Sequence, residues 1–125
     1  MIEVKTVIDK EEATAFLRAR GIETDLGPLF VMCATEKGNL LGVGAVSMDA
    51  GGAKIEEVVC DEDIDWLIGK ALLNSLDLGG IKNVTLDNPK LFKLAKFLRF
   101  KEESGEYRLN LEGYFEAGCS GCGLN

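Results

Sequence analysis

Apolar and polar positions along the chain form short blocks, and each block predicts one structural element. Apolar–polar alternation and β-branched runs between turn residues are typical of strands over residues 2–7, 29–35, 40–48, 54–60, 81–87, 101–103 and 106–111. Apolar residues at helical spacing predict helices from the capping pattern of Asp9 and Glu12 to Gly21, over residues 65–78, and from Asn88-Pro89 onward.

The resulting order is β-α-β-β-β-α-β-α-β-β, which predicts a mixed α/β fold. Glu36-Lys37-Gly38-Asn39 and Ser104-Gly105 are turn signals that join neighbouring strands as hairpins. Residues 1–111 hold all the predicted elements and are expected to form a single domain, since 125 residues suffice for one core. Residues 112–125 form a glycine- and cysteine-containing C-terminal tail.

Charge and composition exclude several classes of function. The net charge is −7, and nucleic-acid binding is disfavoured because it relies on clustered lysine and arginine. No apolar run reaches the roughly 20 residues that cross a bilayer, so no membrane span is expected. The N-terminus lacks a basic segment followed by an apolar one, which favours a cytoplasmic protein. The absence of histidine removes the commonest general base and metal ligand.

The segment from Ala53 to Leu73 predicts a buried strand, an acidic loop and an apolar helix. A helix N-terminus attracts anions because its first amides lack partners and carry partial positive charge. The loop, however, carries its own carboxylates: Asp61, Glu62, Asp63 and Asp65. These acids either complement the helix dipole or repel a phosphate. A calcium loop is a third interpretation, but Trp66 and Leu72 stand where glycine and glutamate are needed.

The element order and several positions resemble the GNAT N-acetyltransferase fold, over roughly residues 1–111. In that family the fourth strand leads into an arginine/glutamine-x-x-glycine-x-glycine/alanine loop. The strand ending at Val59 and the loop 60–69 have the matching length, and Gly69-Lys70-Ala71-Leu72-Leu73 matches the helix start. Ile64 replaces the basic residue and Leu67 the first glycine, so only Gly69 of that signature remains.

A second match follows the fifth predicted strand. Family members carry an asparagine there and a glycine–phenylalanine pair at the end of the next helix, and Asn88 and Phe100 fall at that spacing. Arg99 occupies the glycine position, and Ala95 the position of the tyrosine that often serves as general acid. The segment from Asn88 to Glu112 is also similar to the acetyltransferase-like N-terminal domain of citrate lyase ligases.

The resemblance implies a cofactor and a set of site residues. It implies acetyl-CoA, transfer of the acetyl group to an unidentified amine, and a pantetheine arm paired with strand residues Val58 and Val59. The diphosphate would lie on the backbone amides of residues 64–69, and the expected cofactor-binding residues are Val58, Val59, Leu67, Ile68, Gly69, Lys70 and Asn88. The departures leave an alternative function, a catalytically inactive GNAT-fold binding or regulatory module.

Glu56 and Glu57 are the candidate catalytic bases, as a glutamate on this strand is in many GNAT enzymes. Neighbouring strand residues face opposite sides, so one carboxylate is expected toward the cleft and the other toward a helix-covered face or solvent. Without a tyrosine at position 95, the remaining proton donors by residue type are Tyr107 and Cys60.

Cys119-Ser120-Gly121-Cys122 is a separate chemical signal in the tail. Two thiols at this spacing can hold one metal ion or form a redox disulfide, and an incidental pair is the plain alternative. A full thiolate site would need further ligands, from Cys60 or from a second chain in a homodimer. Cys33, inside an apolar strand, is expected to be a core residue.

Overall fold

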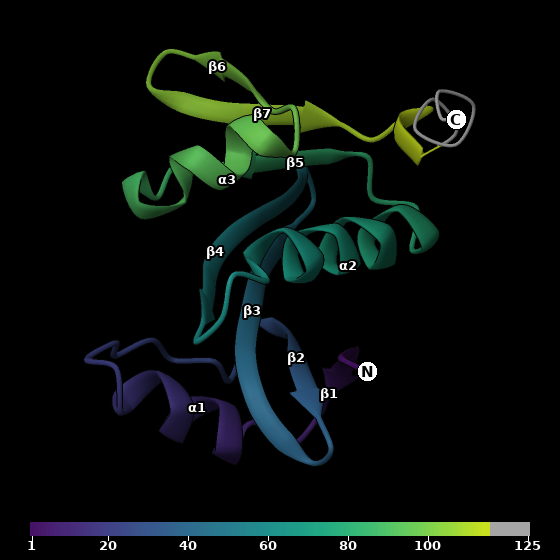
Figure 1. The fold of residues 1–125 in the computed structure, drawn as a ribbon. Coiled ribbons are helices and arrows are strands. Elements are labelled where there is room, and N and C mark those ends of the chain that lie inside the picture. Colours follow the sequence, from purple (N-terminus) through teal and green to yellow (C-terminus); the bar gives the residue numbers. More distant parts are fainter. Residues whose placement is uncertain (116–125) are drawn as a thin grey trace.

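The computed structural model describes residues 1–115, and these form one seven-stranded mixed sheet with helices on both faces (Figure 1). The strand order is β1-β2-β3-β4-β5-β7-β6. The strands are β1 (Glu3–Val7), β2 (Phe30–Glu36), β3 (Asn39–Asp49), β4 (Gly52–Cys60), β5 (Asn83–Leu86), β6 (Lys101–Glu103) and β7 (Glu106–Asn110). The helices are α1 (Glu11–Arg18), α2 (Asp65–Leu78) and α3 (Phe92–Phe97), with a 3-10 turn, η1 (Pro89–Leu91), before α3. The predicted α/β element order is confirmed.

Both predicted hairpins are present, and the backbone explains them. Lys37 and Gly38 connect β2 to β3 with φ angles of 52° and 82°, and Ser104 and Gly105 connect β6 to β7 with 54° and 82°. Two successive residues with positive φ match the right-handed twist of the flanking strands. At α1 the capping prediction is only partly right: the Asp9 carboxylate accepts from the Glu11 amide, but the helix begins at Glu11.

The sheet separates two apolar cores. α2 and α3 cover one face and bury the larger core, in which Ile68, Leu72 and Leu73 are fully enclosed. α1 covers β2 and β3 on the other face through Ala13, Phe16 and Leu17. We call these the α2–α3 core and the α1 core. Within the described residues no helix is both long and apolar enough to cross a bilayer.

β4 and β5 are parallel neighbours but touch over a short stretch only. Ala53 pairs with Val84 and Lys54 with Thr85, and residues 55–60 of β4 have no partner on β5. Gly52 lies at the start of this junction with φ of 147°, and a Cβ atom there would stand 2.3 Å from the Asn83 carbonyl oxygen. The strands therefore separate after Lys54. We call this opening, between residues 55–60 of β4 and the end of β5, the splay.

The segment after β5 follows the predicted capping pattern. The Asn88 side chain accepts a hydrogen bond from the Lys90 amide at 3.1 Å, and Pro89 takes the first helical position. α3 ends in a left-handed residue, Arg99, with φ of 71°. The Phe100 amide donates to the Ala95 carbonyl at 2.9 Å across that residue. Glycine is the usual residue at such a helix end, so Arg99 occupies a strained position.

Candidate functional site

A β-bulge in β4 brings both candidate bases to the same face of the sheet. Ala45 on β3 pairs with Glu57 and Val46 pairs with Ile55, so Glu56 is an extra residue in β4. Ile55 and Val58 therefore both face the α2–α3 core, and Glu56 and Glu57 both face the other side. The expectation that these two carboxylates face opposite sides is wrong, because strict alternation fails at a bulge.

Each of these carboxylates is held by a hydroxyl group. The Ser47 hydroxyl, on β3, donates to Glu56 Oε2 at 2.6 Å. The Thr24 hydroxyl, in the loop after α1, donates to Glu57 Oε2 at 3.1 Å. Both acids are half-buried. The sequence analysis did not identify either hydroxyl residue, since no spacing links Ser47 or Thr24 to β4.

The splay exposes one backbone edge of β4. Asn88 Nδ2 donates to the Glu56 carbonyl oxygen at 3.3 Å, which places that carbonyl on the side facing β5. The Asp61 amide donates to Leu41 O, on the β3 side, at 3.0 Å. Backbone groups alternate along a strand, so those of Val58 and Cys60 face the splay and those of Val59 face β3. Among the expected residues, Asn88 and Val58 are thus brought together at this edge.

The amides at the start of α2 are partly satisfied by the chain itself. The Ile64 amide donates to Glu62 O, those of Leu67 and Ile68 both donate to Ile64 O, and the Trp66 amide donates to the Asp65 carboxylate. Within the described residues the amides without a hydrogen-bond partner are those of Glu62, Asp63 and Asp65. The available anion donors therefore precede the residues 64–69 that the resemblance implies.

Gly69 and Lys70 lie beyond that free end of α2. Gly69 is buried within α2, and a Cβ atom there would stand 2.8 Å from Leu98 Cδ1 of α3. The absence of a side chain at Gly69 therefore lets α2 and α3 approach closely. Lys70 is exposed.

One of the loop carboxylates is neutralised by α1. Arg20 donates to Asp61 Oδ1 and Oδ2 at 2.8 and 2.6 Å, and its guanidinium carbon lies 3.4 Å from the centroid of the Phe16 ring. The hydrogen bond from Arg20 holds the pKa of Asp61 below its usual value. Glu62, Asp63 and Asp65 make no ion pair in the part of the chain that the structure describes. A clear excess of negative charge therefore surrounds the free amides.

The other residues considered as proton donors or ligands have well-defined surroundings. Tyr107 is buried in the α2–α3 core, with its ring centroid 4.8 Å from that of Phe92. Cys60 is half-buried at the end of β4, and burial raises the pKa of its thiol. Ala95 is fully buried. Burial, aided by Glu12, raises the pKa of the Cys33 thiol to about 11, in keeping with its predicted place in the core.

The tail cysteines, Cys119 and Cys122, lie outside the described residues, so the metal and redox predictions for this pair remain predictions. Among residues 1–115 no group of three or more cysteine, aspartate or glutamate side chains is placed to hold a metal ion. The acidic loop is accordingly not a preformed cation site.

Comparison with solved structures identifies the fold. The ribosomal-protein-S18-alanine N-acetyltransferase from Escherichia coli aligns with a TM-score of 0.66 and 14% identity over 83% of this chain and 80% of its own. The PaiA N-acetyltransferase from Thermoplasma acidophilum, solved with coenzyme A, gives 0.64 and 14% over 87% and 97%. N-acetylglutamate synthase from Neisseria gonorrhoeae, solved with coenzyme A and L-arginine, gives 0.72 and 11% over 87% and 33%.

No family model matches the sequence, and no curated protein matches it either. The likeness is therefore one of three-dimensional structure at low sequence identity. The chain has the GNAT acyl-CoA N-acyltransferase fold, as its sequence resemblance led us to expect.

Proposed function

We propose that this protein transfers an acetyl group from acetyl-CoA to an amine. The observation that carries the proposal is the splay, where β4 leaves β5 after Lys54 and the bulge at Glu56 presents two carboxylates beside the open edge. An exposed strand edge can pair with an amide-containing chain, and carboxylates beside it can accept a proton. The acceptor amine is unidentified.

The residues at the splay fit the parts of coenzyme A in different degrees. The backbone groups of Val58 and Cys60 suit the amides of a pantetheine arm, and Asn88 lies across the opening from them. The free amides of Glu62, Asp63 and Asp65 provide donors for a diphosphate. When bound, acetyl-CoA supplies an acetyl group activated as a thioester.

Glu56 and Glu57 are the proposed proton acceptors. The attacking amine loses a proton as its nitrogen bonds to the acyl carbon and the carbon–sulfur bond breaks, and a carboxylate within hydrogen-bond reach can take that proton. Ser47 and Thr24 orient the two carboxylates by donating to one oxygen of each, which leaves the second oxygen of each for the amine. Glu56→Gln and Glu57→Gln, compared with Glu102→Gln on exposed β6, separate their contributions.

The charge around the loop makes a distinctive binding test. Glu62, Asp63 and Asp65 oppose the phosphates, so added salt should screen repulsion and tighten acetyl-CoA binding, the reverse of an ordinary basic phosphate site. Neutralising two exposed charges in Glu62→Gln/Asp63→Asn should tighten binding roughly three- to tenfold at low salt. Calorimetric titration at several NaCl concentrations measures both effects, with Glu102→Gln as the matched control.

Thermal unfolding provides an independent test of binding. Acetyl-CoA at 100 times its Kd should stabilise the fold by about 2.7 kcal/mol. No shift in the unfolding midpoint at millimolar acetyl-CoA, in both the wild type and the Glu62→Gln/Asp63→Asn variant, would refute the proposal.

A binding or regulatory module without turnover is the second candidate. The observation that favours it is Ala95, which is fully buried where GNAT enzymes often carry the tyrosine that protonates the leaving thiolate. Acetyl-CoA binding without acetylation of any amine, followed by mass spectrometry across a panel of polyamines, amino acids and peptides, would favour this candidate. The tail pair Cys119 and Cys122 would then be its thiol or metal element, tested by metal analysis of anaerobic protein against a double serine variant.

A further inference from the structure

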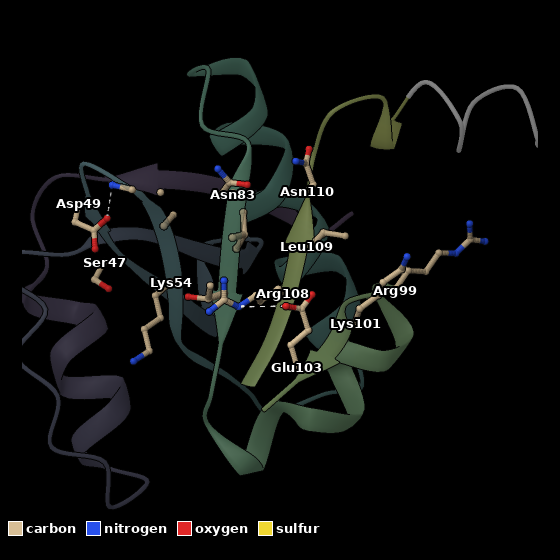
Figure 2. A pocket seen from close by; sticks show the side chains of 15 residues that line it. Ser47, Asp49, Lys54, Asn83, Arg99, Lys101, Glu103, Arg108, Leu109 and Asn110 are labelled. Atoms are coloured by element: carbon tan, nitrogen blue, oxygen red, sulfur yellow. Dashed lines mark hydrogen bonds and ion pairs between the residues drawn. The ribbon is translucent and has the colours of Figure 1, made fainter. Parts of the chain in front are cut away.

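A hollow lies on the sheet face that α1 leaves uncovered. Its volume is about 810 Å³, within the range usual for small-ligand sites, and it extends over β4, β5, β7 and β6 (Figure 2). The side chains around it are mostly polar, and several are cationic. The α2–α3 core lies behind this part of the sheet, so the hollow and that core are on opposite faces.

A row of side chains crosses the floor of the hollow from strand to strand. Lys54 on β4 pairs with Thr85 on β5, and Thr85 pairs in turn with Arg108 on β7. Arg108 also pairs with Lys101 on β6. These residues share one face, because their strand neighbours Ile55, Val84 and Tyr107 lie in the α2–α3 core. We call Lys54, Thr85, Arg108 and Lys101 the cationic row.

The charges of the row are only partly balanced. Lys54 forms an ion pair with Asp87 at 2.8 Å, and Arg108 forms one with Glu106 at 2.9 Å (Figure 2 shows its longer contact with Glu103). Lys101 has no ion pair within residues 1–115. It stands directly across the strands from Arg108, and like charges in that position destabilise a sheet. An anion bound between them would remove this repulsion.

The hollow also reaches the proposed reaction centre. Ser47 lines it, and the same hydroxyl donates to Glu56. A molecule in the hollow could therefore place one end at Glu56 and the other over the cationic row. On a chain with a net charge of −7, this local excess of positive charge runs against the average.

We propose that the hollow binds an anionic group, a carboxylate or a phosphate, of the acceptor amine, with Lys101 as its main contact and Arg108 and Lys54 beside it. The amine of the same molecule lies toward Glu56. The anion site stands on the geometry of the row, whereas its role as part of the acceptor site rests on the proposed acyl transfer.

The test is an NMR titration of ¹⁵N-labelled protein with matched probes and no cofactor. L-Glutamate is compared with L-glutamine, and O-phospho-L-serine with L-serine, so that the carboxylate and phosphate sources are separated. We expect saturable shifts at the amides of Lys54, Thr85, Arg108 and Lys101 with an anionic probe and much weaker ones with its neutral partner. Lys101→Glu should weaken that binding by about fivefold or more. Lys93→Glu, the same charge change at an exposed site on α3, should leave it unchanged.

Equal shifts with charged and neutral probes would overturn the proposal, as would equal affinities in Lys101→Glu and Lys93→Glu. Lys101→Gln keeps the test valid if the charge reversal disturbs β6, and should give a smaller loss in the same direction. Acetyl-CoA binding is read in separate spectra from the amides of Val58 and Cys60. Failure of the proposed acyl transfer therefore shows there, while failure of the anion site shows at the row.

Discussion

Replacement of Gly52 by alanine tests the junction that creates the splay. A Cβ atom at this position would stand 2.3 Å from the Asn83 carbonyl oxygen, and the φ angle of 147° is one that side-chain-bearing residues rarely adopt. Neither conflict can be relieved by a change of rotamer, because both involve the backbone. The strained φ costs about 1–2 kcal/mol. Each weakened β4–β5 hydrogen bond costs roughly 0.5–1.5 kcal/mol more.

We therefore expect Gly52→Ala to lower the free energy of unfolding by about 2–4 kcal/mol, a large part of the 5–15 kcal/mol typical of a domain. With a urea m-value near 1.5 kcal/mol/M, the unfolding midpoint should fall by roughly 1–2 M. Gly51→Ala is the matched control, since its Cβ atom would meet nothing closer than Asp49 Oδ1 at 3.4 Å. Equal midpoints for the two variants would refute the assignment of Gly52 as the residue that sets the junction.

The remaining predictions concern strain, pH and thiol reactivity. Arg99→Gly should raise the free energy of unfolding by about 0.5–1 kcal/mol, because glycine adopts the observed φ of 71° without strain; a lower urea midpoint would contradict this. Arg20 lowers the pKa of Asp61, so the stability from this pair is present above about pH 4 and is lost as pH falls through the lowered value; Asp61→Asn should flatten that part of the thermal midpoint–pH curve. Cys33 and Cys60 have raised pKa values, so in a variant with serine at both tail cysteines they should react slowly with a disulfide reagent until urea unfolds the protein.

Features that depend on neighbouring residues were predictable from the sequence. The turn at Lys37-Gly38 and the cap at Asn88-Pro89 are each determined by two adjacent residues, whose backbone preferences act wherever the chain lies. The periodic apolar residues of α2 also determined its bounds, since helix formation and burial favour the same face.

The candidate site was less predictable because it is assembled from distant segments. Glu56 and Glu57 were assigned to opposite faces on the assumption of a regular strand. The uneven spacing of the buried apolar residues Ile55 and Val58 was the available sign of a bulge. The pairing of Arg20 with Asp61 joins residues 41 positions apart, and no periodicity encodes such a contact.

The cationic row was missed for a related reason. Its members come from β4, β5, β7 and β6, and they become neighbours only once the register of each pair is known. A shift of one residue in any of these pairs would turn a side chain to the other face. Single basic residues in otherwise acidic segments carry no sign of such an alignment.

The short β4–β5 junction also has a consequence for how the protein responds to temperature. The two parts of the sheet, β1–β4 and β5–β7, share few backbone hydrogen bonds and are joined mainly by the α2–α3 core, which includes residues from both. Apolar burial loses strength on cooling. Cold, rather than heat, should thus be the condition that parts β4 from β5 while the hairpins on each side stay intact, and it would widen the opening that the proposed acetyl-CoA site uses.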